Sequence, residues 1–220
     1  ERLGINLVKL LKQKPIPGVD AVIANPRAVR ADTRFVESDM NRSFGDMFKG
    51  SYETERAQWL RKKASQYGLV LDFHNTQTPS NNCSFVGPDC QTQLYEIAKQ
   101  LDLRNCIIAD YDCINKVCLN TLSIEISIGD ELDAAAVWYD KLKAITTKQA
   151  SSNKLAIYKF LRRVSWDEKT QYELADWLPF KLLSTLDKNQ LGVSGIIVPI
   201  FIGSRLTQYY ATLLTKKEVL

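Results

Sequence analysis

The side chains best suited to chemistry begin with His74, the single histidine of the chain, and Asp72 two residues before it. Residues 69–73 form a continuous apolar run interrupted only by Asp72, which predicts a buried strand that ends just before His74. Residues two apart in a strand face the same side, so Asp72 could orient the imidazole as outer-shell carboxylates do for metal ligands. The alternative is a hydrogen-bonded structural histidine, because one histidine alone cannot make a catalytic zinc site.

A second carboxylate, Glu125, lies inside the apolar run of residues 122–126, which also predicts a strand. A carboxylate is costly to bury there unless it is paired or close to a metal. The alternation of the strand could instead turn it toward solvent, and the pattern leaves both options open. Buried near a metal, its pKa would suit a general base.

Four arginines, Arg27, Arg30, Arg34 and Arg42, fall within a charged stretch whose weak periodicity over residues 28–49 predicts a long loop. Arginine binds carboxylates through two parallel hydrogen bonds, with better geometry than lysine. The loop is therefore a candidate binding site for an anionic substrate. A solvated basic loop is the alternative.

The elements expected around these residues alternate between strands and helices, which predicts an α/β layered domain with chemistry at the carboxyl ends of its strands. Strands are predicted at residues 19–24, 69–73, 106–109, 122–126, 155–164 and 195–202. Helices are predicted at residues 2–13, 51–67, 91–101, 130–147 and, weakly, 205–217. A polar stretch at 149–153 reads as a linker, and Trp166 and Trp177 are expected to pack a small β-rich module beyond it.

Composition narrows the class of protein. The 220 residues are 45% hydrophobic and carry a formal charge of +4, with lysines and arginines scattered rather than clustered, which argues against nucleic-acid binding. Five cysteines without a C-x-x-C pair argue against a disulfide framework or a thiolate zinc site and favour reduced thiols in a cytoplasmic protein. No membrane span or signal peptide is recognised, so no membrane partner is expected.

Several short segments resemble, in the right order, the aspartoacylase and succinylglutamate desuccinylase family, which has a zinc carboxypeptidase-type fold. They are Asn25-Pro26-Arg27-Ala28-Val29, Thr33-Arg34, Asp39-Met40-Asn41-Arg42-Ser43-Phe44, Leu71-Asp72-Phe73-His74-Asn75-Thr76, Ser123-Ile124-Glu125-Ile126, Val198-Pro199-Ile200-Phe201 and Tyr209-Tyr210. The resemblance implies a three-layer α/β hydrolase domain with a mixed central sheet over residues 1–150. It also implies a smaller β-rich domain over residues 151–220 that contributes to the cover of the active site.

The resemblance also implies a metal site. The family binds one Zn²⁺ per chain through a His-Gly-x-Glu motif and a later histidine. Glu1 resembles the glutamate of that motif and His74 the later histidine. The first histidine is then expected three residues before Glu1, upstream of this sequence. Such a ligand set leaves a coordination position open for water.

Catalytic roles follow from the same matches. Glu125 resembles the general base that takes a proton from water and later passes it to the leaving amine. Arg34 resembles the residue that polarises the acyl carbonyl and steadies the developing oxyanion. The substrate-binding residues implied are Asn41, Arg42, Asn75 and Tyr209. Among them Asn41 and Arg42 match a pair that holds the carboxylate of the substrate, and Tyr209 matches a tyrosine that closes over it.

The expected function is zinc-dependent amide hydrolysis of a small anionic N-acylated amino acid, foremost N-acetyl-L-aspartate, in a possible homo-oligomer. One departure concerns the substrate. The aspartoacylase branch has an arginine about ten residues before the base, where this chain has Asn115, and no arginine occurs between Arg104 and Glu125. The alternatives are an aminoacylase for other N-acetyl amino acids, a desuccinylase, or a non-catalytic protein that binds carboxylates.

Overall fold

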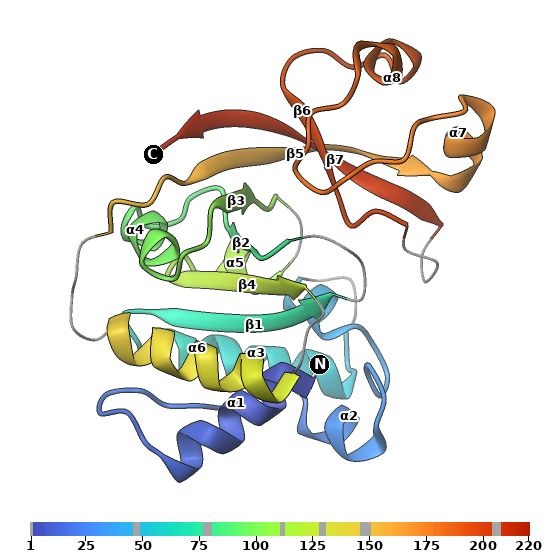
Figure 1. Cartoon of the computed structure of the whole chain (residues 1–220). Helices are drawn as coiled ribbons and strands as arrows, with labels where there is room; N and C mark the ends of the chain where they lie inside the picture. The colour runs from blue at the N-terminus through green and yellow to red at the C-terminus, as the bar shows by residue number, and fades with distance from the viewer. Residues whose placement is uncertain are drawn as a thin grey trace.

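A computed structural model describes residues 2–45, 49–76, 81–110, 113–127, 131–145, 151–203 and 208–220. In these ranges seven strands form one mixed sheet in the order β1-β4-β2-β3-β5-β7-β6 (Figure 1). β1 pairs in parallel with β4, and β3 with β2 and β5, whereas the β2–β4, β5–β7 and β6–β7 pairs are antiparallel. The strands are β1 (Val70–Thr76), β2 (Cys83–Val86), β3 (Asn105–Ile108), β4 (Thr121–Ser127), β5 (Ala156–Ser165), β6 (Ile197–Ile200) and β7 (Tyr209–Val219).

The helices begin where the sequence supplies caps. The Ser51 side chain accepts a hydrogen bond from the Thr54 N–H, and the Asn25 side chain accepts one from Ala28 N–H ahead of Pro26 at the first helical position. The helices are α1 (Arg2–Gln13), α2 (Pro26–Ala31), η1 (a 3₁₀ helix, Met40–Phe44), α3 (Tyr52–Ala64), α4 (Gln93–Gln100), α5 (Ile114–Val117), α6 (Glu131–Ile145), α7 (Trp166–Gln171) and α8 (Thr185–Gln190).

The two faces of the β1–β4 pair differ in character. Alternate residues such as Phe73 and Ile124 join the largest apolar cluster with side chains of α1, α4 and α6. There the Trp138 ring of α6 packs edge-on against Phe73 at a centroid distance of 5.4 Å. On the opposite face Val70 joins a smaller cluster with Ala64 of α3 and with α5. Helices therefore cover both faces. Asp72 and His74 of β1 and Ser123 and Glu125 of β4 point toward the α3 and α5 side, whereas Asn75 faces α1.

The C-terminal residues continue the same sheet. β5 pairs with β3, and β7 lies between β5 and β6. A separate apolar cluster forms farther along these strands, where the Tyr210 ring lies 5.1 Å from Trp166 and 5.3 Å from Trp177. Both tryptophans thus contact Tyr210, while the separate β-rich module stays a prediction. The division at residue 150 stays a prediction, and residues 149–150 of the predicted linker lie outside the described ranges.

Two element predictions were wrong. Residues 19–24 are not a strand, and the carbonyls of Ile23 and Ala24 accept hydrogen bonds from the Arg56 guanidinium at 2.8 Å. The segment predicted as a helix at 205–217 is strand β7 where it is described, paired with β5 along its length. The short strand β2 and the short helices α5, α7 and α8 were missed. The predicted loop of residues 28–49 also contains most of α2 and all of η1. No helix among the described residues combines the length and the apolar character needed to cross a membrane.

Candidate active site

The site is set by the register between two neighbouring parallel strands. β1 runs on through His74 to Thr76 instead of ending before the histidine. His74 pairs with Glu125 of β4, and Asp72 pairs with Ser123. Because residues in register on paired strands face the same side, the four side chains lie together on the face that α3 and α5 cover.

The imidazole of His74 is held by a carboxylate. Its Nε2 lies 2.8 Å from Asp72 Oδ2, and Ser123 Oγ lies 3.0 Å from the same oxygen. Burial raises the pKa of Asp72. The nearby His74 and the hydrogen bonds from His74 and Ser123 together lower it by a larger amount, so the net pKa lies below the usual value. A carboxylate on one ring nitrogen is the arrangement that outer-shell carboxylates give to metal-binding histidines.

Asn115 stands behind this pair. Its side chain is almost fully buried and donates from Nδ2 to the carbonyls of Phe85 at 3.0 Å and Thr121 at 3.1 Å. Its Oδ1 lies 2.8 Å from Ser123 Oγ. The single hydroxyl hydrogen of Ser123 can therefore point to Asn115 or to Asp72. Asn115 joins β2 to β4 and ends a chain of polar contacts that begins at His74.

Glu125 is partly buried between β1 and β2, neither sealed in the core nor turned fully into solvent. Cys83 of β2 is its register partner on the other side and is fully buried. Burial, followed by the nearby charge of Glu125, raises the pKa of the Cys83 thiol well above its ordinary value. Cys83 is thus a neutral, apolar neighbour of the carboxylate.

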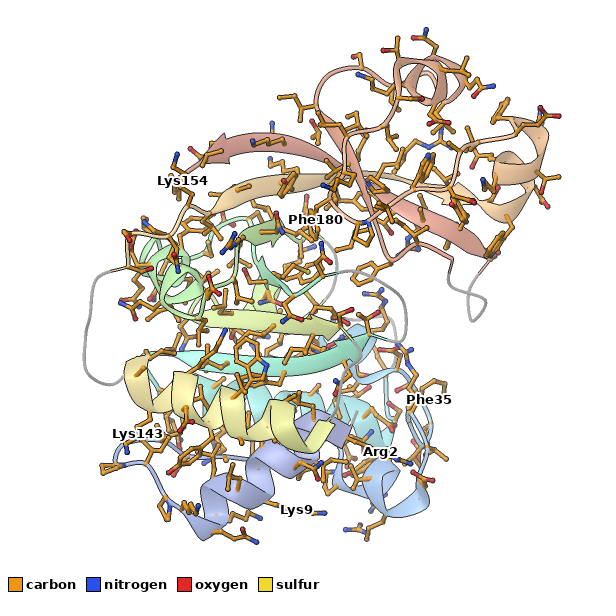
Figure 2. The ribbon with its side chains drawn as sticks, in the orientation of Figure 1. Arg2, Lys9, Phe35, Lys143, Lys154 and Phe180 are labelled. Atoms are coloured by element: carbon orange, nitrogen blue, oxygen red, sulfur yellow. The ribbon has the colours of Figure 1, made fainter. Side chains whose placement is uncertain are left out.

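The first turn of α1 is tied to the strand residue that follows His74. The Leu3 N–H donates to Asn75 Oδ1 at 3.2 Å, so the Asn75 side chain is engaged by the helix. Figure 2 shows Arg2 on the side of the molecule toward which the β1 and β4 arrows point, whereas Lys143 lies at the other end. Glu1, predicted as a metal ligand, lies outside the described residues.

The arginine loop leads into η1, whose N-cap is Asp39. The Asp39 carboxylate accepts from the Asn41 N–H at 2.9 Å and pairs with the Arg34 guanidinium at 3.0 Å. Arg34 is 77% exposed. η1 lies next to α5, because Phe44 at its end packs in the same apolar cluster as Ile114. Burial raises the pKa of Cys113, the nearby charge of Arg42 opposes this rise, and the charge of Asp72 adds to it.

Tyr209 begins β7, where it pairs with Ser165 of β5. Gln208 Nε2 donates to its hydroxyl at 2.8 Å, and the Arg163 guanidinium lies over its ring, 4.7 Å from the centroid. This cation–π contact keeps the positive charge of Arg163 next to the Tyr209 ring.

No three histidine, cysteine, aspartate or glutamate side chains gather as a metal site among the described residues. His74, with Asp72 on its Nε2, has the form of one zinc ligand with its supporting carboxylate. The donors among the described residues therefore fit part of a zinc site, and Glu1 as a further ligand stays a prediction.

The sequence of this site matches a known family. A family model described as the succinylglutamate desuccinylase/aspartoacylase catalytic domain matches residues 6–117, just over half of the chain. The chain belongs to this family. The match includes β1 with His74 and the arginine loop, and it ends before Glu125.

Members of the succinylglutamate desuccinylase/aspartoacylase family also appear among its relatives. A rat N-acyl-aromatic-L-amino acid amidohydrolase is 34% identical over 84 residues, 32% of this chain and 26% of that protein. A probable aspartoacylase from Acaryochloris marina is 30% identical over 91 residues, 34% of this chain and 31% of that protein. The matched stretches thus span about a quarter to a third of these relatives.

Solved structures from the family share the fold. Murine aminoacylase 3 has a TM-score of 0.68 at 16% identity, covering 99% of this chain and 91% of its own. The succinylglutamate desuccinylase of Chromobacterium violaceum also has a TM-score of 0.68, at 14% identity, covering 90% and 73%. The mixed sheet of this chain is therefore that of the family.

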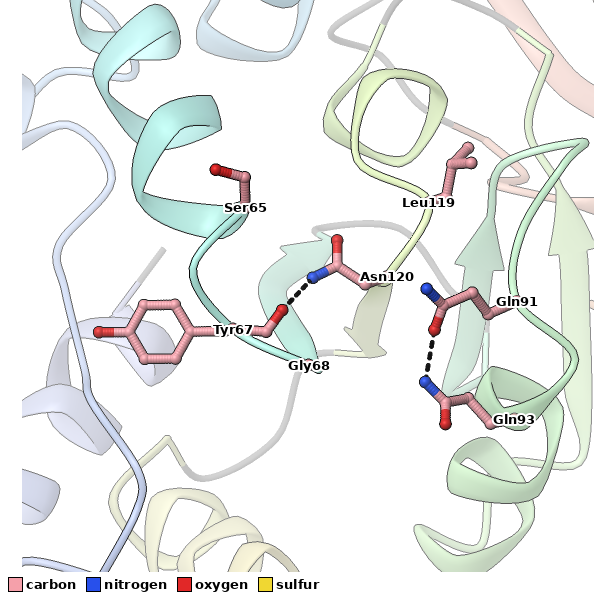
Figure 3. Close-up of a pocket in the computed structure, with 7 residues that line it drawn as sticks. All are labelled: Ser65, Tyr67, Gly68, Gln91, Gln93, Leu119 and Asn120. Atoms are coloured by element: carbon pink, nitrogen blue, oxygen red, sulfur yellow. Dashed lines mark hydrogen bonds between the residues drawn. The ribbon is translucent and has the colours of Figure 1, made fainter.

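A cavity of about 350 Å³ lies at the other end of the β1–β4 pair (Figure 3). Gly68 and Asn120, which line it, precede β1 and β4, whereas His74 and Glu125 lie toward the strand ends. Asn120 Nδ2 donates to the Tyr67 carbonyl across this cavity at 2.6 Å. Its remaining lining consists of Ser65, Tyr67, Gln91, Gln93 and Leu119.

Sequence reasoning missed the supporting role of Ser123. The signal was available, because Ser-x-Glu on β4 repeats the spacing of Asp-x-His on β1, and period-two alternation puts all four on one face once the strands pair in register. The structural role of Asn115 gave no such signal, since its partners are backbone carbonyls from distant parts of the chain.

We expect Asn115→Leu, a change of similar volume, to lower the free energy of unfolding by about 2 to 5 kcal/mol, because two buried carbonyls lose their donor at about 1–3 kcal/mol each. Urea unfolding measures the loss. Asn189→Leu, on the exposed face of α8, is the control and should change stability by no more than about 0.5 kcal/mol. Equal stabilities for the two variants would contradict the bridging role of Asn115.

Proposed function

We propose that this protein hydrolyses the amide bond of an N-acylated amino acid. The observation that carries the proposal is the register of β1 and β4, which sets a carboxylate-held imidazole beside the partly buried Glu125. Hydrolysis of an amide requires an activated water, a proton carrier for the leaving amine, and groups that fix the substrate. Membership of the family and the names of its relatives support this reaction class.

His74 and Glu1 would hold a zinc ion, with the Asp72 carboxylate on the Nε2 of His74 supporting the imidazole. When bound, zinc supplies Lewis-acid polarisation and a water of lowered pKa. Asp72 keeps the imidazole in one orientation, and Ser123 in turn fixes the Asp72 carboxylate. Their contribution is to have the ligand in place before the substrate arrives.

Glu125 is the proposed general base. Its carboxylate takes a proton from the attacking water and delivers it to the nitrogen of the leaving amino acid. Partial burial beside the neutral Cys83 limits its contact with bulk water, which favours a proton carrier over a permanently solvated anion.

The arginine loop is proposed to bind the anionic end of the substrate. Asn41 and Arg42 would hold the α-carboxylate, and Arg34 would polarise the acyl carbonyl. η1, which carries both residues, packs against α5 through Phe44, which supports this placement. Tyr209 would close over the substrate together with Arg163, and Asn75 would act mainly by securing α1 beside the site.

The side-chain specificity rests on Asn115. Both hydrogens of its amide are given to backbone carbonyls, so it offers no donor to a second carboxylate. This favours an N-acetyl amino acid with an uncharged side chain over N-acetyl-L-aspartate, the substrate that the residue pattern first indicates. The similarity to the rat aromatic amidohydrolase supports the same choice.

A substrate panel tests the reaction and its specificity. With zinc-loaded full-length protein, we expect acetate release from N-acetyl-L-tyrosine with a kcat/KM at least about tenfold above that for N-acetyl-L-aspartate, the ratio given by about 1.4 kcal/mol. A preference for N-acetyl-L-aspartate would overturn the specificity and keep the reaction. No release from any N-acyl amino acid, together with absent zinc, would favour a carboxylate-binding protein.

Replacing the proposed base should separate metal binding from turnover. We expect Glu125→Gln to retain the zinc content of the parent and to lose about 10²- to 10⁴-fold in kcat, because the amide cannot carry the proton. Glu218→Gln, an exposed strand residue, should keep both values and serves as the control. Near-parental turnover in Glu125→Gln would place the base elsewhere.

Removing the proposed carboxylate anchor should act on binding. We expect Arg42→Ala to raise KM by about tenfold or more, since a charge-assisted hydrogen bond contributes about 1.5–3 kcal/mol. Arg30→Ala removes the same charge from an exposed position at the end of α2 and should leave KM near its parental value. Steady-state kinetics compares the two, and equal KM values would refute the assignment.

A further inference from the structure

Glu53, in the first turn of α3, is a fully buried carboxylate that the chemistry above does not use. It accepts four hydrogen bonds. Asn25 Nδ2 donates to Oε1 at 3.0 Å, and the backbone N–H of Val36 donates to the same oxygen at 2.7 Å. The N–H groups of Glu37 and Ser38 both donate to Oε2 at 3.2 Å. Three consecutive backbone donors of the arginine loop therefore converge on one side chain of the helix.

Hydroxyl contacts extend this anchor toward η1. Ser38 Oγ lies 3.0 Å from Ser43 Oγ and 2.8 Å from Ser51 Oγ, so the middle of the loop, η1 and the cap of α3 are joined. At the other side Asn25 also caps α2 through the Ala28 N–H. Glu53 thus binds both the residue that caps α2 and the middle of the loop.

The charge of the carboxylate matters for this anchor. Successive backbone N–H groups form a concave site for an anion, and hydrogen bonds to an ionised acceptor are about twice as strong as neutral ones. Burial raises the pKa of Glu53. The hydrogen bonds from Val36, Asn25, Ser38 and Glu37 together lower it by a larger amount, so the net pKa lies below the ordinary 4.5. A neutral amide at this position would leave at least one N–H without an acceptor.

We propose that Glu53 is a positioning residue for substrate binding: its carboxylate fixes the backbone of residues 36–38 and so sets the places of Arg34 on one side and Asn41–Arg42 on the other. Only the expected effect of Glu53 on enzyme kinetics rests on the proposed function. The anchoring of the loop by an internal anion stands on the contacts themselves.

The kinetic test compares Glu53→Ala with Glu55→Ala, an exposed carboxylate two residues along the same helix. For Glu53→Ala we expect KM for the N-acetyl amino acid to rise by about tenfold or more, because the Arg42 anchor is displaced. We expect kcat to fall as well, because Arg34, which polarises the acyl carbonyl, is displaced with it. Glu55→Ala should match the parent. An unchanged KM in Glu53→Ala, or a loss confined to kcat, would overturn the proposal.

Chemical rescue distinguishes anchoring from general damage. Truncation at Glu53 leaves a cavity with three inward N–H groups, which formate can fill as the missing carboxylate. Added formate should lower the KM of Glu53→Ala toward the parental value and leave the parent and Glu55→Ala unchanged. Failure of formate to lower the raised KM would refute the anchoring role.

Amide hydrogen exchange gives a readout that needs no activity. The N–H groups of Val36, Glu37 and Ser38 should exchange faster in Glu53→Ala than in the parent, and formate should restore their protection. Glu53→Gln, which keeps the shape, should show the same faster exchange without rescue and covers the case in which the alanine variant fails to fold. If the parent is inactive on every N-acyl amino acid, the proposed function fails, while exchange still decides whether Glu53 holds the loop. Unaltered exchange in both variants would refute the anchor itself.

Discussion

The parallel pairing of β1 with β4 is the constraint on which the candidate site depends. Its register sets His74 opposite Glu125 and Asp72 opposite Ser123, so one run of backbone hydrogen bonds positions four polar side chains together. A slip of one residue would turn β4 over, sending Glu125 into the apolar cluster and Ile124 to the polar face. The burial of Ile124 and Leu122 against the helices opposes such a slip, because it would expose two fully buried side chains. The core on one face thus specifies the chemistry on the other.

The sequence predicted the strands that carry this site, since their apolar runs are strong signals. It was less informative where long-range contacts decide the structure. Residues 19–24 look like a strand, yet the carbonyls of Ile23 and Ala24 bind the side chain of Arg56, which lies in helix α3. The start of β7 looks weakly helical on its own, and pairing with β5 makes it extended. Local pattern is overridden in both cases by a partner that single-sequence reasoning cannot place.

The same limit applies to the polar residues. His74 and Glu125 stood out by type and position, and Asp72 by its spacing. Glu53 did not, because an acidic residue in the first turn of a helix is usually explained by the helix dipole alone. Its role depends on the loop folding back so that three backbone donors meet one carboxylate. Buried anchors of this kind are visible only once the backbone around them is known.

The ladder between β5 and β7 is interrupted by register shifts near Tyr158, Phe160 and Val164. Irregularities of this type strengthen local twist and let a two-stranded ribbon curl. Because both strands belong to the main sheet at one end and to the Trp177 cluster at the other, they cannot act as a free hinge. If the far end of β5 and β7 were displaced, the two strands would bend elastically. Tyr209 would then move together with Arg163, whose guanidinium lies over its ring.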